Sequence, residues 1–312
     1  MRNTRIHRTL LLLLVLCLSL STVACATPSV FEEGAPQLSF VDDTGTRVAL
    51  NAPPRRVAVL FSSLADVWVS AGGEVAITVG ESIERGFAEA DAILVDAGAG
   101  KTVNTELLLA ADPDLVLCSP DIAAQVNAAA LLRAWGIPAA CFRIESFSDY
   151  LRVLKICTEL TGRADKYEEN GTRVLSRIEE MRAELTEKPL QRVLFVRASA
   201  TSVKAKIASD HFAAAMLEEL GAYNIANDAP VLIDGISEEV LLKENPDRIF
   251  VSFMGNEESA KESLAANETW QSLSAVKEMR CHYLPKSLFQ YKPNARWDEA
   301  YAYLIGLLYE EQ

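Results

Sequence analysis

Histidine is scarce in this sequence, at three of 312 residues. His7 lies in the N-terminal segment, which leaves His211 and His282 for the rest of the chain. Sites for bare zinc or manganese ions generally need more nitrogen ligands or closely spaced carboxylates, so a free metal-ion site is disfavoured. The chain also lacks a G-x-S-x-G motif, the turn that exposes a nucleophilic serine. No spacing of aspartate, histidine and serine indicates hydrolysis, and we expect no catalysis.

Basic residues are also few, at 30 against 43 acidic ones, for a net charge of −13. Three of the 30 and none of the 43 lie in residues 1–24, so removal of that segment would make the balance more acidic still. An acidic surface repels phosphate backbones. Nucleic-acid binding is therefore not expected.

A long apolar run occurs once, at residues 10–20. It is about half the length that a membrane-spanning helix needs, and arginines precede it, as in a signal peptide. Ala24 and Cys25 resemble a bacterial lipobox, although Thr22 departs from the usual aliphatic residue. We expect a signal peptide at 1–24, lipidation of Cys25 and a flexible tether at 25–37. Ordinary cleavage after Ala26 is the alternative, and both place the mature protein outside the cytoplasm.

Cysteine pairs of the C-x-x-C type are absent. Cys17 would leave with the signal peptide. The remaining cysteines, apart from Cys25, are Cys118, Cys141, Cys157 and Cys281. Three of these lie in or beside apolar runs, where cysteine usually acts as a small buried hydrophobe. A bridge between Cys118 and Cys141 stays open in an oxidising compartment.

A complete phosphate-binding loop is missing as well. Residues 97–102 read AGAGKT, but the full pattern needs glycine five places before Gly100, where this chain has Val95. A nucleotide site is therefore not expected.

The rest of the chain alternates short aliphatic runs with helical patterns, which indicates parallel α/β units. Its length suits two domains. Expected strands are 57–60, 75–79, 115–117 and 139–144 in the first half, and 192–196, 248–253 and 282–284 in the second. We predict two α/β lobes with mostly parallel central sheets flanked by helices, at 38–146 and 189–312, joined by a helical segment at 147–188.

An internal repeat supports two similar lobes. Residues 105–119 read TELLLAADPDLVLCS and residues 238–252 read EEVLLKENPDRIFVS. Each copy predicts a helix, a proline turn and a buried strand, and the two copies suggest lobes of similar construction. Between them, residues 163–188 are rich in charge, and the apolar stripe of Val174, Leu175, Ile178 and Met181 predicts one long helix. Its position between matching halves favours an interdomain helix, and an ordinary surface helix of a single domain is the alternative.

Several motifs, in order, resemble the periplasmic-binding proteins for iron complexes, haem and corrinoids. Residues 38–60 resemble the family's entry hairpin and its Pro-Pro-basic turn into the first strand. Residues 73–80, 103–106, 112–117 and 220–226 resemble later steps of the same fold. The resemblance runs from about Leu38 to the C-terminus. It implies a rigid two-lobed binding protein with one interdomain helix, a ligand in the cleft, and an ABC permease with its ATPase as partners.

The resemblance also implies a docking role for two glutamates. In this family, one acidic residue at the tip of each lobe pairs with arginines of the permease. The matching positions are Glu106 and Glu239, which the internal repeat also relates to each other. The alternative is that both are first-turn glutamates favoured by the helix dipole.

Most candidate ligand contacts follow expected strands, because ligand groups gather at the carboxyl ends of strands in α/β lobes. His211 instead opens an expected helix where the family often contacts ligand. Tyr291 and Lys292 lie in a run of cations and aromatic residues at 284–297, for which a solvated loop is the alternative. Cations there would attract an anionic complex, and aromatic rings would stack on a flat one. The candidates are Phe61, Ser62, Arg143, Arg197, Lys204, Lys206, His211, Tyr291 and Lys292. For His211, two interpretations stay open: a haem ligand opposite Tyr291 or Met254, or a helix cap. Trp297 is expected in the core.

These inferences predict a protein that binds and delivers a ligand, with no intrinsic cofactor and no catalysis. The expected ligand is an iron–siderophore complex, haem or a corrinoid, and an anionic siderophore fits the cations best. The expected protein is a monomer held at the membrane by its lipid. Two alternatives remain: a free metal-ion binding protein of the same rigid architecture, and a lipid-anchored sensor domain.

Overall fold

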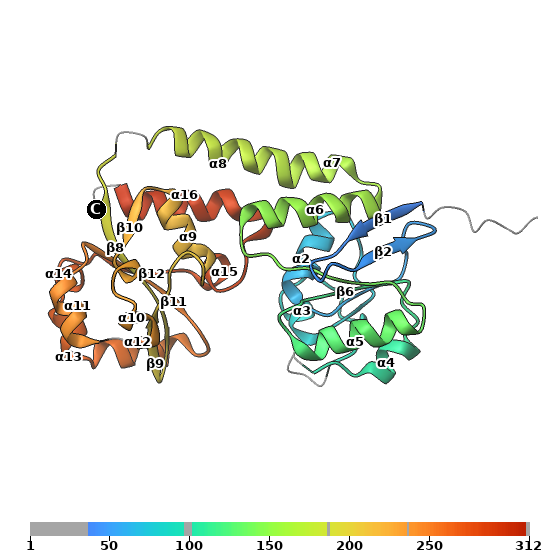
Figure 1. The fold of residues 1–312 in the computed structure, drawn as a ribbon, viewed down its shortest axis with the longest axis horizontal. Helices are drawn as coiled ribbons and strands as arrows, with labels where there is room; N and C mark the ends of the chain where they lie inside the picture. Colours follow the sequence, from blue (N-terminus) through green and yellow to red (C-terminus); the bar gives the residue numbers. More distant parts are fainter. Residues whose placement is uncertain (1–36, 97–101, 186–187, 236, 310–312) are drawn as a thin grey trace, which may run out of the picture. The chain divides into compact units, whose positions relative to one another are not determined.

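Two sheets organise the described part of the chain (Figure 1). The computed structural model describes residues 37–96, 102–185, 188–235 and 237–309, and residues 37–312 form one compact unit. The expected signal peptide, Cys25, nearly all of the tether and residues 97–101 lie outside the described residues. No helix in the described ranges is long and apolar enough to cross a membrane.

The N-terminal half holds a five-stranded sheet in the order β5-β4-β3-β6-β7. All neighbouring strands are parallel, as expected from the alternating pattern. The strands are β3 (Val57–Val59), β4 (Ile77–Thr78), β5 (Ile93–Leu94), β6 (Leu115–Cys118) and β7 (Ala139–Cys141). The helices between them are α2 (Ser62–Ser70), α3 (Gly80–Glu84), α4 (Thr105–Ala110) and α5 (Ala123–Ala134).

The expected entry hairpin is confirmed as β1 (Leu38–Val41) and β2 (Arg47–Leu50), which pair antiparallel. Asp42 fixes its turn, because one carboxylate oxygen accepts hydrogen bonds from the amides of Thr44 and Thr46, both at 2.9 Å. The other oxygen accepts from the Cys141 amide at 3.0 Å and pairs with Arg133 at 2.5 Å. The hairpin is thereby attached to the edge strand β7.

The C-terminal half holds the second sheet, in the order β10-β8-β11-β12, with β9 antiparallel to β8. Its strands are β8 (Gln191–Ser199), β9 (Ser202–Ala205), β10 (Ala222–Asn224), β11 (Arg248–Phe253) and β12 (Cys281–Tyr283). Its helices are α9 (Phe212–Glu219), η2 (Ile225–Asn227), α10 (Val231–Asp234), α11 (Glu238–Glu244), α12 (Glu257–Ala265), α13 (Glu268–Ser272), α14 (Ser274–Lys277), α15 (Lys286–Phe289), η3 (Asn294–Arg296) and α16 (Trp297–Tyr309).

The internal repeat has the same structure in both halves. One copy forms α4 and β6, and the other forms α11 and β11. The repeated aspartate also accepts backbone hydrogen bonds in both copies. Asp114 accepts hydrogen bonds from the amides of Arg55 and Arg56 just before β3, at 2.6 and 2.9 Å. Asp247 accepts one from the Arg192 amide in β8, at 3.1 Å. Asp114 thus links β6 to β3, and Asp247 links β11 to β8.

The connector consists of α6 (Phe147–Thr161), a left-handed turn at Gly162, and a second helical run. That run comprises α7 (Ala164–Tyr167), the π-helical turn η1 (Glu168–Thr172) and α8 (Arg173–Ala183). It confirms the long helix expected within 163–188 and spans about 30 Å at 1.5 Å per residue. In Figure 1 it passes over α6 and α16, and Arg177 of α8 pairs with Asp298 of α16 at 2.5 Å.

One hydrophobic core contains residues from both sheets and the connector. Trp297 lies within it at 1% exposure, as expected. Its ring lies 6.0 Å from Phe147 of α6 and 5.5 Å from Phe212 of α9, measured between centroids. Because α6 follows the first sheet and α9 belongs to the second, these rings hold the two halves together without relying on the connector alone.

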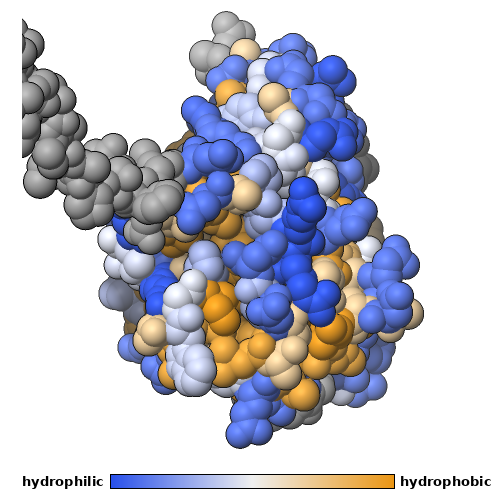
Figure 2. Space-filling model, turned by 90° about the vertical axis from the view of Figure 1, so that its right-hand side faces the viewer, coloured by the Kyte–Doolittle hydropathy of each residue, from blue (hydrophilic) through white to orange (hydrophobic). Residues whose placement is uncertain are grey.

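The buried thiols of Cys118 and Cys141 lie side by side on β6 and β7, with their sulfurs 3.6 Å apart. All four described cysteines are free, so the structure contains no Cys118–Cys141 disulfide. The outer end of the N-terminal half shows apolar surface between hydrophilic residues (Figure 2). Large exposed apolar side chains in this half include Leu131 and Trp135, of which Trp135 is 70% exposed.

Candidate functional site

The strand order changes direction once in each sheet. The first sheet grows outward from β3 and β6, and the second from β8 and β11. Connections that leave two adjacent strands in opposite directions open a crevice at the carboxyl ends of those strands, where α/β proteins bind ligands. The carboxyl ends of these four strands are therefore the candidate site.

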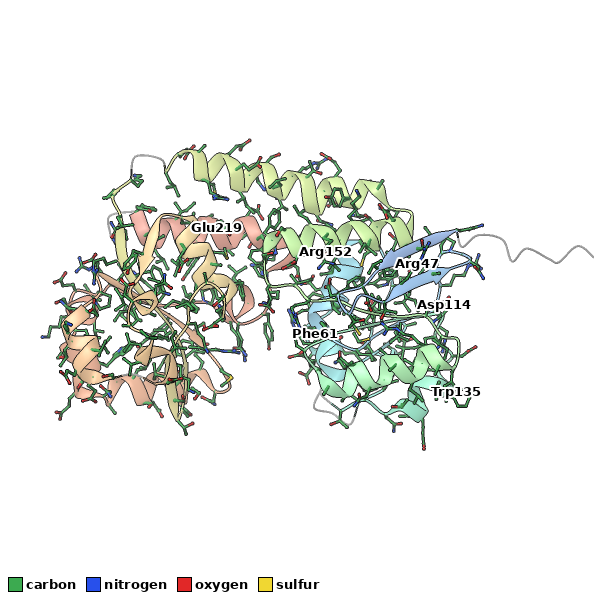
Figure 3. All side chains as sticks on the ribbon, in the orientation of Figure 1. Arg47, Phe61, Asp114, Trp135, Arg152 and Glu219 are labelled. Carbon is green, nitrogen blue, oxygen red and sulfur yellow. The ribbon has the colours of Figure 1, made fainter. Side chains whose placement is uncertain are left out.

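Polar side chains meet at the end of β3 in the N-terminal half. The Ser62 hydroxyl is buried, donates to Glu81 and accepts from Arg85 at 2.9 Å. Phe61 is half-buried and packs against the shared core. Figure 3 places it on the side of the N-terminal half that faces the C-terminal half. Both hydrogen-bond partners of the Ser62 hydroxyl, at the start of α2, are therefore charged side chains.

Arg85 links this cluster to the C-terminal half. Its guanidinium lies 4.0 Å from the centroid of the Tyr291 ring and 4.8 Å from that of Phe87. Burial, opposed by nearby Asp66 and Glu81, lowers the pKa of Arg85. A cation placed between two rings gains from their quadrupoles, so Arg85 holds Tyr291 against the N-terminal half.

A second link joins the same segment to α2. The Asn294 amide donates to the Ser63 carbonyl at 3.0 Å and to the Asp66 carboxylate at 2.8 Å. Burial raises the pKa of Asp66, and the hydrogen bond from Asn294 opposes that rise. The loop between α15 and α16 thus belongs to the C-terminal half by sequence and rests on the N-terminal half by contact.

Cations gather at the end of β8 in the C-terminal half. Arg197 lies opposite Lys204 in the β8–β9 pairing and opposite Ser252 in the β8–β11 pairing. Among the described residues, Arg197 makes no ion pair, and its Nε atom and the Ser252 hydroxyl are both buried without hydrogen-bond partners. Burial lowers the pKa of Arg197. Buried polar groups are usually paired. These two are among several buried side-chain atoms of the described residues without a partner, and they lie on neighbouring strands at the switch point of the second sheet.

His211 lies among these cations. Its Nδ1 accepts a hydrogen bond from the Ala213 amide at 3.2 Å, which caps α9. Its ring lies 4.8 Å from that of Phe195 and 4.7 Å from that of Phe212. Burial, followed by the charges of Lys292, Arg197 and Lys206, lowers the pKa of His211 to about 3. Of the two expected interpretations, the structure shows the helix cap.

Lys292 lies where the two halves meet. Its ammonium group lies 2.6 Å from the Glu145 carboxylate, which follows β7. The same group lies 4.8 Å from the centroid of the Phe212 ring. Arg143, at the end of β7, is exposed and pairs with Asp121 through two donors. The structure therefore brings Arg197, Lys206, His211 and Lys292 together and leaves Arg143 in a separate ion pair.

Both candidate docking glutamates are exposed in the first turns of their helices. Glu106 lies in α4, where Asn104 caps the helix by accepting from the Leu107 amide at 3.1 Å. Glu239 lies in α11 beside Glu238. Neither carboxylate takes part in an ion pair with another described residue. Both are available to a partner, on matching helices of the two halves.

A described cavity lies elsewhere. It has a volume of about 680 Å³ and lies beside the amino ends of β4 and β5, lined by Arg56, Glu74, Phe87 and Ile93 among others. It touches none of the expected contact residues. Within the described ranges, no group of three or more histidine, cysteine, aspartate or glutamate side chains is placed to hold a metal ion.

Sequence reasoning missed Glu81, Arg85, Asp66 and Asn294. Glu81 and Arg85 are four residues apart just after a strand, a spacing that places charges on one side of a helical turn. That signal was available. Asp66 and Asn294 carry no local signal, because their contact joins α2 to a loop far along the chain.

Comparisons with known proteins agree with this architecture. The family profile described as "Periplasmic binding protein" matches residues 57–288. No curated protein sequence matches significantly. An ABC transporter substrate-binding protein from Listeria monocytogenes is 18% identical, with a TM-score of 0.66, over 82% of this chain and 99% of that one.

Two further solved structures are similar. SirA from Staphylococcus aureus, complexed with staphyloferrin B, is 20% identical with a TM-score of 0.63, over 88% of this chain and 97% of that one. The periplasmic haem-binding protein RhuT from Roseiflexus sp. RS-1, in apo form, is 17% identical with a TM-score of 0.64, over 82% and 98%. At these identities the similarity shows the shared fold.

Proposed function

This chain belongs to the periplasmic binding protein family, and we propose that it is the extracytoplasmic substrate-binding subunit of an ABC importer. It captures an iron–siderophore complex, haem or a corrinoid between its two halves and hands the intact complex to a permease. The protein binds and releases its ligand without chemical change. Similar proteins are described as binding a siderophore complex or haem, which supports the first two of these ligand classes.

One observation carries the proposal: the unpaired Arg197 beside the unpaired hydroxyl of Ser252 at the switch point of the second sheet. Leaving a buried polar group unpaired costs about 1–3 kcal/mol. An anionic ligand would recover that cost by accepting hydrogen bonds from both groups. Lys204 and Lys206 on the adjoining hairpin would add attraction.

An anionic ferric siderophore fits this arrangement better than haem or a corrinoid. Arg197 and Lys206 would donate hydrogen bonds to its catecholate or carboxylate oxygens. Tyr291, which precedes Lys292 in the same loop, would offer an aromatic ring beside them. Haem would present two carboxylates on a flat apolar ring, whereas the side chains that act on His211 include three cations, Arg197, Lys206 and Lys292. His211 is engaged as a helix cap through Nδ1, so it is a poor iron ligand through that atom.

Intrinsic fluorescence tests the proposal directly. Trp297 lies 5.5 Å from Phe212, which contacts Lys292, so ligand binding should alter its emission. The mature protein is titrated with an anionic ferric tris-catecholate, ferrichrome, haemin, cobalamin, and free ferric and zinc ions. Saturable submicromolar binding of one intact complex supports the proposal. A response to bare ions alone would replace it with free metal-ion binding.

We further propose that Glu106 and Glu239 dock the protein on a permease, and that a lipid on Cys25 holds it at the membrane. The two glutamates lie on helices that the internal repeat relates, so a two-fold symmetric permease would meet equivalent charges. Exposed ion pairs contribute little affinity individually, but they steer encounter and fix register. Replacement of Cys25 by alanine would release the protein from the membrane fraction.

A further inference from the structure

Lys292 lies between two opposite charge environments. On one side, the Glu145 carboxylate is 2.6 Å away, and Asp121 and Asp149 are close enough to act on the ammonium group. On the other side are the cations Arg197 and Lys206, which act with Lys292 on His211. Asp121 and Asp149 are themselves paired with Arg143 and Arg152, so Glu145 is the carboxylate that directly pairs with Lys292. Among the described residues, Arg197 and Lys206 on the other side make no ion pair.

The two partners of the ion pair are unequally exposed. The Lys292 side chain is 20% exposed and the Glu145 side chain 52%. Lys292 is held in place by Phe212 and by the loop that Asn294 anchors to α2. Glu145 lies before the cap of α6 and contacts solvent over half its side chain. Lys292 is therefore the fixed member of the pair, and Glu145 is the member that can leave.

We propose that Glu145 is an internal competitor for the anionic ligand: its carboxylate occupies Lys292 until a ligand oxyanion displaces it. This inference rests on the proposed function and assigns a specificity role to a residue outside the expected contacts. A neutral or cationic complex cannot replace the carboxylate, so the ion pair between Lys292 and Glu145 stays intact in its presence. An anionic complex replaces the carboxylate of Glu145 with its own oxyanion at little cost, and selectivity for negative charge follows.

A purely structural role makes the opposite prediction. If the pair served only to hold the two halves together, its loss would loosen the site and weaken the binding of every ligand. If it serves as a competitor, its loss frees Lys292 and strengthens the binding of anions alone. The sign of the change in affinity separates the two roles.

The test is a titration of wild type and Glu145→Gln with anionic ferric tris-catecholate and with neutral ferrichrome. Glu145→Gln should bind the catecholate on the order of five-fold more tightly, the size of one partly exposed ion pair, and ferrichrome unchanged. Glu159→Gln is the matched control, because Glu159 is exposed on α6 and has no ion pair among the described residues. Weaker catecholate binding by Glu145→Gln would overturn the proposal.

A double-mutant cycle shows whether Glu145 acts through Lys292. Lys292→Gln should weaken catecholate binding. In the Lys292→Gln background, adding Glu145→Gln should strengthen catecholate binding by less than it does in wild type, because only the general repulsion between Glu145 and the ligand is then relieved. An equal gain in both backgrounds would mean that Glu145 repels the ligand without holding Lys292, which contradicts the proposal.

A readout without ligand separates this inference from the proposed function. Acetic anhydride labelling, followed by mass spectrometry, should modify Lys292 faster in Glu145→Gln than in wild type. Equal rates would show that the pair does not form in solution and would overturn the inference whatever the protein binds. Faster labelling, together with wild-type protein that binds none of the anionic complexes, would overturn the proposed ligand and leave the ion pair in place.

Discussion

His211 shows at the residue scale how burial sets a charge state. It is 8% exposed, and its pKa of about 3 lies well below the usual 6.5. A histidine whose folded pKa is lowered adds stability that is complete above about pH 6.5 and is lost as the pH falls toward the folded value. Near neutral pH it is a neutral ring, and the positive charge of the site comes from Arg197, Lys206 and Lys292.

The corresponding prediction concerns stability in mild acid. As the pH falls from 7 to 5, the free energy of unfolding of the wild type should decrease by up to about 2 kcal/mol, because His211 gains a proton in the unfolded state and not in the folded state. His211→Gln keeps a cap acceptor and cannot gain a proton, so it should lose less over the same interval. Chemical denaturation at both pH values measures the difference, with exposed Asn51→Gln as control. Parallel losses in His211→Gln and wild type would mean that the ring titrates normally.

The sequence made some site residues predictable and hid others. Arg197 and Lys206 follow the expected strand 192–196, so the α/β pattern alone placed them near one crevice. Lys292 lies in the loop between α15 and α16, and a run of cations and aromatic residues pointed to it. Arg85 carried a weaker signal, its spacing from Glu81. The contact between Asp66 and Asn294 depends on how a late loop folds back on an early helix, and no local pattern encodes it. The expected roles in ligand binding remain predictions.

At the scale of elements, the repeated aspartates give a paired experiment. Asp114 accepts two backbone hydrogen bonds and Asp247 accepts one. A typical hydrogen bond contributes about 1 kcal/mol. Asp114→Ala should therefore destabilise the protein by roughly twice as much as Asp247→Ala. Urea denaturation compares them, and exposed Asp91→Ala serves as control. A larger loss of stability for Asp247→Ala than for Asp114→Ala would contradict the role of these hydrogen bonds in linking the strands.

Gly171 gives a second prediction at this scale. It lies in the π-helical turn, where an added Cβ atom would stand 3.2 Å from Leu151 and 3.3 Å from Leu154 of α6. Gly171→Val should force the two helices apart and cost about 1–3 kcal/mol. Ser176→Val, on the exposed side of α8, should cost less. Thermal unfolding measures both, and equal effects would show that the helices do not pack closely at Gly171.

Elements were the most predictable level. Most strands, the entry hairpin, the repeated helix–strand step and the long connector had signals in hydrophobic spacing, proline turns or family resemblance, whereas the short strands β5 and β10 were not among the expected strands. The π-helical turn and the antiparallel β9 had none. Both depend on packing: the π-turn places Gly171 against α6, and β9 places Lys204 opposite Arg197. Local propensity does not report such long-range fits.

For the whole molecule, the shared core and the connector imply a rigid body that presents its surface in fixed register. Glu106→Lys combined with Glu239→Lys should lower ligand-stimulated ATPase activity of the reconstituted importer by roughly ten-fold, because reversed charges oppose docking. Ligand affinity should stay unchanged. Glu179→Lys, exposed on α8, is the matched control. Full activity of the double variant would remove these glutamates from the docking surface.

The central claim is that the unpaired cation at the end of β8 binds an anionic iron complex. The most direct measurement compares wild type and Arg197→Gln by calorimetric titration with ferric tris-catecholate. Binding by Arg197→Gln should be weaker by at least about ten-fold, the loss expected for hydrogen bonds to a charged group, with thermal stability retained. Equal affinity in the two proteins would contradict the claim and place the ligand elsewhere on the molecule.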